Sequence, residues 1–164
     1  MALDMIAADF GIRQLHARFA DAVWRQDAES FAACWSSAGT WKIAGLDMQG
    51  REAIQTGCGQ LLGRCTRIHL VIGQPILIEE GACVRGRLGV TEFAWMPDGT
   101  QFITFGQYHD RYVEEAGAWR FAERFWSFKY RGPIDLSAPL VPTPDYGAFP
   151  GAPGPDEETY VRKA

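Results

Sequence analysis

The 164-residue sequence has no excess of basic residues and no long apolar run. Sixteen Lys and Arg residues stand against twenty Asp and Glu residues, which gives a formal net charge of −4. Nucleic-acid binding through bulk electrostatics needs a basic surface, so this class of partner is excluded. No apolar run approaches the ~20 residues that span a bilayer, and the first ten residues contain no Lys or Arg. We therefore expect no membrane partner and no signal peptide.

Residue patterns of metal sites and common catalytic motifs are also missing. The sequence has three histidines, and the spacings of its four cysteines match no zinc or redox pair. Neither a phosphate-binding glycine motif nor a Ser-His-Asp arrangement occurs. We expect no metal, no cofactor, and reduced thiols in a cytoplasmic protein.

Proline is scarce in the body of the chain and abundant after it. Seven of the nine prolines follow residue 132, and such a segment cannot join a helix interior or a central strand. The composition predicts a domain over 1–131 and an extended tail over 132–164. Apolar residues within 133–150 predict that this first part docks on the body or on a neighbouring subunit, whereas the last eleven residues read as solvated.

Aromatic residues are plentiful at 13%, with six Trp, five Tyr and ten Phe. Each buried ring removes roughly 150–250 Å² from water. Composition alone is compatible with either a large core or an apolar cavity.

The first third of the sequence has the helical period. Apolar residues three and four apart predict a helix over 4–24: Ile12, Leu15, Phe19 and Val23. Asp27 suits the N-cap of a second short helix that reaches Trp35. A brief strand over 40–43 and a third helix from Gly50 complete this part.

The rest of the domain reads as strands over about 66–79, 82–95, 101–115 and 118–130, with turn signals between the last three. Consecutive strands with short connections predict antiparallel pairing. Helices followed by strands predict an α+β fold in which the helices pack on one face of a curved sheet.

Strand alternation identifies one unusual carboxylate. Glu92 shares the more apolar face of its strand with Val90 and Leu88. An inward carboxylate is costly unless it is paired or protonated, so Glu92 is a site candidate; a bulge or a position at the strand end is the alternative. Arg124 lies among aromatic residues, which indicates stacking on a ring or anion binding.

The histidines give weaker signals. His69 lies in a strand that is apolar on both faces, which favours a core residue over a base in a pocket. His16 is expected at the edge of the first helix. His109 alternates with Gln107 and Arg111, which predicts exposure to solvent.

Several segments together resemble one family. They are Leu15–Asp27, Phe31–Trp35, Gly39–Ile43, Gly50–Ile54, Arg67–His69, Gly106–Tyr112 and Gly117–Phe121. Over roughly residues 10–131 the sequence resembles SnoaL-like proteins of the nuclear-transport-factor-2-like superfamily. The resemblance implies a cone-shaped, curved antiparallel sheet wrapped by three N-terminal helices, with an apolar pocket between them. It also implies a homo-oligomer, a dimer or a trimer.

The resemblance assigns roles to particular positions. In the scytalone-dehydratase and hexachlorocyclohexane-dehydrochlorinase branch, a histidine matching His69 is the base and a helix aspartate orients it. Here Trp24 stands at the aspartate position, so Asp21 or Glu92 would have to orient His69. The resemblance and the expected convergence of elements give the pocket lining: Phe19, Trp24, Trp41, Phe93, Tyr108, Arg124 and Trp126.

Two functions follow as expectations. The first is a cofactor-independent lyase, isomerase or cyclase that acts on a small apolar, aromatic or polycyclic molecule with a histidine base. The second is a binding module of the same fold without catalysis, because a tryptophan cannot accept the imidazole N–H.

Overall fold

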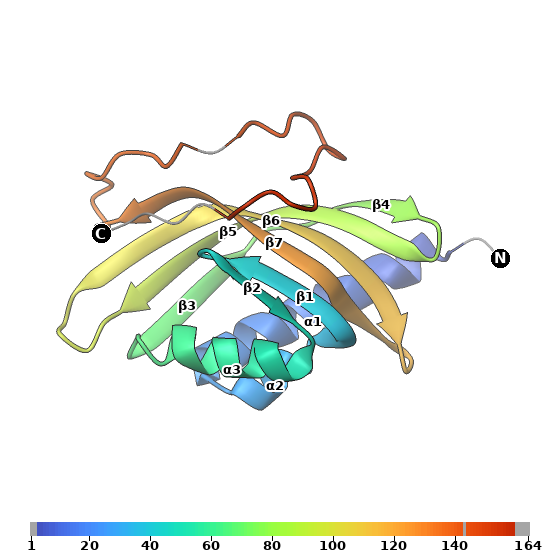
Figure 1. The fold of residues 1–164 in the computed structure, drawn as a ribbon, viewed down its shortest axis with the longest axis horizontal. Helices are drawn as coiled ribbons and strands as arrows, with labels where there is room; N and C mark the ends of the chain where they lie inside the picture. Colours follow the sequence, from blue (N-terminus) through green and yellow to red (C-terminus); the bar gives the residue numbers. More distant parts are fainter. Residues whose placement is uncertain (1–2, 143, 160–164) are drawn as a thin grey trace.

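The computed structural model describes residues 3–142 and 144–159. It contains three helices and a curved seven-stranded sheet (Figure 1). The helices are α1 (Met5–Arg25), α2 (Ala28–Ala32) and α3 (Arg51–Leu62). The strands are β1 (Trp35–Ile43), β2 (Leu46–Gln49), β3 (Arg67–Ile72), β4 (Ile76–Glu80), β5 (Cys83–Trp95), β6 (Gln101–Glu115) and β7 (Ala118–Gly132). The predicted α+β fold is confirmed.

Local sequence explains where the first two helices begin. The side chain of Asp4 accepts hydrogen bonds from the first-turn amides of α1, and that of Asp27 accepts one from Ser30 in α2. The apolar stripe predicted for the first helix is buried in α1. The second helix is shorter than expected, because Trp35 already belongs to β1.

The sheet differs from the expected one in three respects. The predicted strand over 66–79 is two strands, β3 and β4, that pair one after the other with β5. Pro75 falls between them and has no N–H to donate to a ladder. The brief strand over 40–43 is the end of the longer β1, which pairs with the unpredicted β2. Finally, β1 runs parallel to β7, while the other pairs are antiparallel.

The three helices cover one face of the curved sheet, and the core lies between them (Figure 1). Strand curvature accompanies register shifts between β6 and β7 near Gly106 and Tyr112. Within the described residues, no helix is both long and apolar enough to cross a membrane.

The tail after β7 returns across the opposite face of the sheet (Figure 1). The Val141 amide donates to the Lys129 carbonyl, and the Arg87 guanidinium donates to the Gly147 carbonyl. Farther along, the Lys42 ammonium donates to the carbonyl of Pro155 at 2.7 Å. The tail therefore contacts β1, β5 and β7, and its Val141 also lines the space between the helices and the sheet.

Candidate functional site

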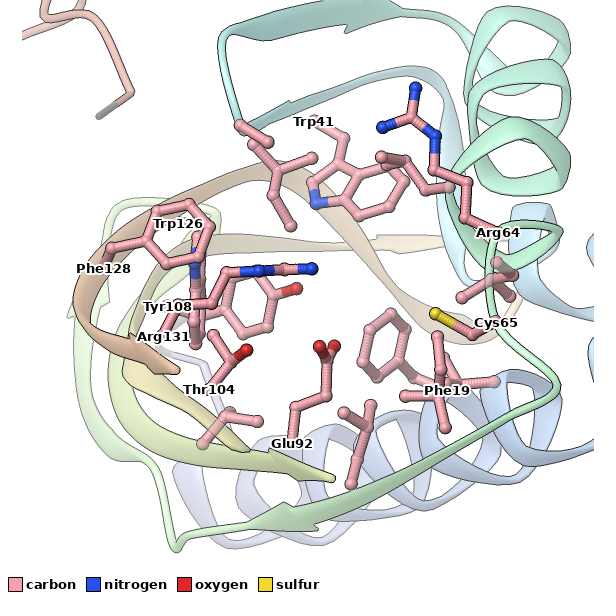
Figure 2. Close-up of a pocket in the computed structure, with 18 of the residues that line it drawn as sticks. Phe19, Trp41, Arg64, Cys65, Glu92, Thr104, Tyr108, Trp126, Phe128 and Arg131 are labelled. Carbon is pink, nitrogen blue, oxygen red and sulfur yellow. The ribbon is translucent and has the colours of Figure 1, made fainter. Parts of the chain in front are cut away.

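A cavity of about 450 Å³ lies between the helices and the concave face of the sheet (Figure 2). Its wall is largely apolar, and its volume falls within the range of small-molecule sites. Aromatic side chains contribute from five elements, namely α1, α2, β1, β6 and β7. They are Phe19, Phe31, Trp41, Tyr108, Trp126 and Phe128.

Glu92 is the acidic residue in the cavity wall (Figure 2). It lies on β5 with Leu70 of β3 opposite it on one side and Thr104 of β6 on the other. Directly opposite residues share a face, so all three side chains turn toward the helices. The inward orientation expected from strand alternation is therefore the one in the structure, and no bulge reverses it.

Burial raises the pKa of the Glu92 carboxyl above its ordinary value, because the charged form loses hydration. The Arg131 guanidinium and the Thr104 hydroxyl act in the opposite direction, and both line the same cavity. Thr104 is 3% exposed. Its position could have been inferred from the alternation of the 101–115 strand, which also places Tyr108 inward.

Three hydrogen-bond donors turn toward the same space, the Trp41 indole, the Tyr108 hydroxyl and the Arg131 guanidinium (Figure 2). The Trp41 indole N–H is buried and lies close enough to the Tyr108 hydroxyl to interact with it. Burial raises the pKa of Tyr108, so its hydroxyl is protonated at neutral pH. Beneath the tyrosine ring lies the Arg124 guanidinium, 3.8 Å from the ring centroid.

Arg124 is placed by an ion pair and does not line this cavity. Its Nε and Nη2 both donate to the Asp110 carboxylate at 2.8 Å. It is 1% exposed and also stacks on Phe121. Arg124 thus stacks on aromatic rings, which was one of the two expectations from the sequence, and it lies outside the wall of this cavity.

The same ion pair continues into a buried network that the sequence did not indicate. The Tyr112 hydroxyl donates to Asp110 at 2.8 Å, and His16 Nε2 lies 2.9 Å from that hydroxyl. Burial, followed by the charge of Arg124, lowers the pKa of His16 well below its ordinary value. His16 is thus a core residue, and the expectation of a helix-edge position is wrong.

His69 and its expected partners lie outside the cavity wall. The His69 side chain is exposed, and no described residue gives it a hydrogen bond or an ion pair. Trp24 packs edge-on against its ring at 6.0 Å, and Phe93 stacks at 6.4 Å. Asp21 is bound to Arg25 at 2.8 Å and is 62% exposed. The structure does not bring His69 and Asp21 together.

Four of the residues expected in the pocket contribute to the cavity wall, namely Phe19, Trp41, Tyr108 and Trp126. Trp24 and Phe93 do not. Trp24 is 46% exposed, and Phe93 pairs with His69 across β3 and β5, which puts it on the outer face. Within the described residues no cluster of three or more His, Cys, Asp or Glu could hold a metal ion.

The outer face holds the third histidine. His109 is 7% exposed, and Tyr146 of the tail packs against its ring at 4.8 Å. Its outward direction follows the strand alternation, but the expected exposure to solvent is wrong because the tail covers it.

Comparison with known proteins gives a family and a fold. A family of SnoaL-like domains matches residues 5–125, whereas no protein of curated function matches the chain. Rv3472 of Mycobacterium tuberculosis, a protein of unknown function, is 23% identical with a TM-score of 0.69, over 76% of this chain and 73% of that one.

Two solved structures that are named after enzyme activities show the same architecture. Hexachlorocyclohexane dehydrochlorinase LinA-type3 from Novosphingobium barchaimii is 17% identical with a TM-score of 0.72, over 85% of this chain and 97% of that one. A proposed scytalone dehydratase from Novosphingobium aromaticivorans is 15% identical with a TM-score of 0.72, over 81% and 97%. At these identities the similarity concerns the fold.

Proposed function

Because this chain belongs to the SnoaL-like domain family, we propose that its cavity carries out cofactor-independent proton transfer on a small apolar molecule. The reaction class is that of a lyase, isomerase or cyclase. The observation that supports it is one carboxylate, Glu92, inside a largely apolar cavity. An ionisable group with a perturbed pKa in a cleft is typical of catalytic sites.

In this proposal Glu92 is the base, in place of His69. The Glu92 carboxylate removes a proton from carbon, and the electrons of that C–H bond form a new double bond while a leaving group departs or an adjacent carbonyl accepts charge. The protonated Glu92 then returns the proton to the leaving group or to another carbon. A raised pKa makes the carboxylate a stronger base than in water.

The neighbours of Glu92 fit this role. Thr104 lies opposite it on the adjacent strand and restricts where the carboxylate can point. Apolar groups such as Phe19 and Leu70 line the same cavity, and burial among them preserves the basicity of Glu92 because the charged form is less hydrated. Rates are expected to rise with pH through the raised pKa of Glu92, because the ionised form is the base.

The test compares two substitutions with two probes. The bicyclic ketone 2-tetralone reports C–H exchange by NMR in D₂O, and hexachlorocyclohexane reports elimination by chloride release. We expect Glu92→Gln to lower whichever activity the protein has by about 10²-fold or more. The matched control, His69→Gln, is expected to leave it unchanged, since His69 lies outside the cavity wall. Loss of activity in the control with retention in Glu92→Gln would contradict the assignment.

A second candidate is ligand binding without turnover. It is favoured by Trp24, which occupies the helix position that the resemblance assigns to the aspartate and packs on His69. Mass spectrometry of molecules released from the denatured protein separates the two functions. A retained compound that the protein leaves unchanged, together with inactivity toward both probes, would support the binding module.

A further inference from the structure

The cavity wall is positively charged, although the chain as a whole is acidic. Two guanidinium groups, those of Arg64 and Arg131, stand against one carboxylate, that of Glu92. The described wall therefore has a net charge of +1 when Glu92 is ionised, whereas the formal net charge of the chain is −4. Charges act more strongly beside apolar groups than in bulk water, so a bound molecule is exposed to an excess of positive charge.

The neutral polar groups of the wall interact with other groups of the wall. The Trp41 indole lies close enough to the Tyr108 hydroxyl to interact with it. The Thr104 hydroxyl acts on the Glu92 carboxyl in the same way. None of these groups carries a positive charge, so recognition of a charged ligand depends on the two arginines.

The two arginines approach the cavity from different elements. Arg131 lies at the end of β7, and Figure 2 shows its guanidinium extended into the cavity. Arg64 follows α3 and lies on the side of Trp41. Both residues are exposed and also line the cavity, which places them at its opening. Arg64 has no hydrogen bond or ion pair with any described residue.

A guanidinium group is suited to one kind of anion. It is always protonated in proteins, and its parallel N–H donors match the two oxygens of a carboxylate. A monoanion also neutralises the net charge of the wall, whereas a dianion exceeds it. Aromatic side chains form the apolar surfaces around the same space and accommodate a flat ring: Phe19, Trp126 and Phe128.

We propose that Arg131, assisted by Arg64, binds the carboxylate of a small aromatic or alicyclic carboxylic acid whose apolar body lies in the cavity. The inference rests on the proposed function and narrows its substrate class from apolar molecules to apolar monoanions. An uncharged halocarbon of the kind that names the neighbouring dehydrochlorinase would gain nothing from the two arginines.

The bound carboxylate also acts on Glu92. The charge of Arg131 lowers the pKa of the Glu92 carboxyl, and a ligand carboxylate beside Arg131 offsets that charge. Glu92 therefore becomes more basic when the ligand is bound, which agrees with its proposed role as the base. The ligand and ionised Glu92 repel each other as like charges, so Glu92→Gln should bind the carboxylate more tightly than wild type does.

Two probes of the same shape test the anion site without requiring turnover. They are 2-naphthoate, which carries a carboxylate, and 2-naphthamide, its uncharged amide. Both affinities are measured by calorimetry at neutral pH for wild type, Arg131→Gln, Arg64→Gln and a control, Arg67→Gln. Arg67 is exposed, lies 5.4 Å from the centre of the Trp24 ring and is outside the cavity wall. Its removal therefore reports the effect of net charge alone.

We expect wild type and Arg67→Gln to prefer the carboxylate by about tenfold or more. Arg131→Gln should bind both probes about equally, and Arg64→Gln should lose part of the preference. The ratio of the two affinities within each variant cancels any general damage to the cavity. Equal affinities in wild type, no binding of either probe, or an unchanged ratio in either cavity variant would overturn the proposal.

Glu92→Gln separates this proposal from the proposed function. The variant should lose catalytic activity and bind 2-naphthoate more tightly than wild type does. If activity survives, the base assignment fails while the affinity ratios still judge the two arginines. If activity is lost and wild type binds both probes equally, the carboxylate site fails while the base assignment stands.

Discussion

We predict that acid lowers the free energy of unfolding of this protein, because His109 is buried in its neutral form. The imidazole lies on the outer face of the sheet beneath Tyr146 of the tail, and it is 7% exposed. Neither ring nitrogen has a hydrogen-bond partner among the described residues. Burial, followed by the charge of Arg87, lowers its pKa to about 4; the charge of Glu157 acts in the opposite direction, and that of Lys129 in the same direction as Arg87.

The sign and the size of the effect follow from linkage. A histidine whose pKa is lower in the folded state favours folding while it is neutral, so its contribution is complete above pH 6.5 and is lost as the pH falls toward 4. With a pKa of about 4 in the folded state and about 6.5 in the unfolded state, the loss is ~2 kcal/mol at pH 5 and ~3 kcal/mol at pH 4. Detachment of the tail alone would also expose His109 to water, and it would require less free energy than global unfolding.

The assay is urea denaturation of wild type and His109→Phe between pH 7.5 and 4. His16 and the carboxylates titrate in both proteins, so they largely cancel in the difference between the two free energies of unfolding. Relative to neutral pH, that difference should change by ~2 kcal/mol at pH 5 and by ~3 kcal/mol at pH 4. The change favours the variant, because only wild type loses the contribution of His109. A constant difference, or an NMR titration midpoint of His109 near 6.5 in the folded protein, would refute the reasoning.

Three further substitutions test packing and charge. Asp110→Asn should lower the free energy of unfolding by about 3–5 kcal/mol, because it leaves the buried Arg124 charge without its counter-ion; a loss below 1 kcal/mol in urea denaturation would contradict this. Gly59→Ala should raise it by roughly 0.5–1 kcal/mol, since a Cβ in this helix meets nothing within 4 Å. Gly106→Ala should lower it by about 1–3 kcal/mol because its Cβ would overlap the Ser127 carbonyl, and a higher melting temperature would refute that.

Hydrophobic periodicity correctly predicts the helices and strands that bury only one of their faces. The first helix is correctly predicted because one face packs on the sheet and the other meets solvent, so its 3.6-residue pattern is strong. Period-2 alternation in the 82–95 strand likewise placed Glu92 inward. In contrast, β2 has four residues and one buried side chain, Met48, which is too little to give a period.

Hydrophobic periodicity does not predict contacts between segments that are far apart in the sequence. The parallel pairing of β1 with β7 joins residues about 80 positions apart. The cover over His109 comes from Tyr146, in a segment without regular structure. The residues around His16 in the sequence do not indicate its partner either, because Tyr112 is 96 residues away along the chain. Polar side chains that are buried by such contacts look exposed in a local pattern.

The register of two strands decides between the residues that the sequence offered as bases. His69 is directly opposite Phe93, and Leu70 is directly opposite Glu92, in the antiparallel pair of β3 and β5. Opposite residues share a face and successive residues alternate. His69 and Glu92 therefore lie on opposite faces of the sheet, and a dyad between them is excluded in this register. A shift of one residue would bring His69 inward, but it would also move Ile68 and Leu70 out of the cavity wall. The apolar pattern of β3 thus favours the register in which Glu92 faces the cavity and His69 does not.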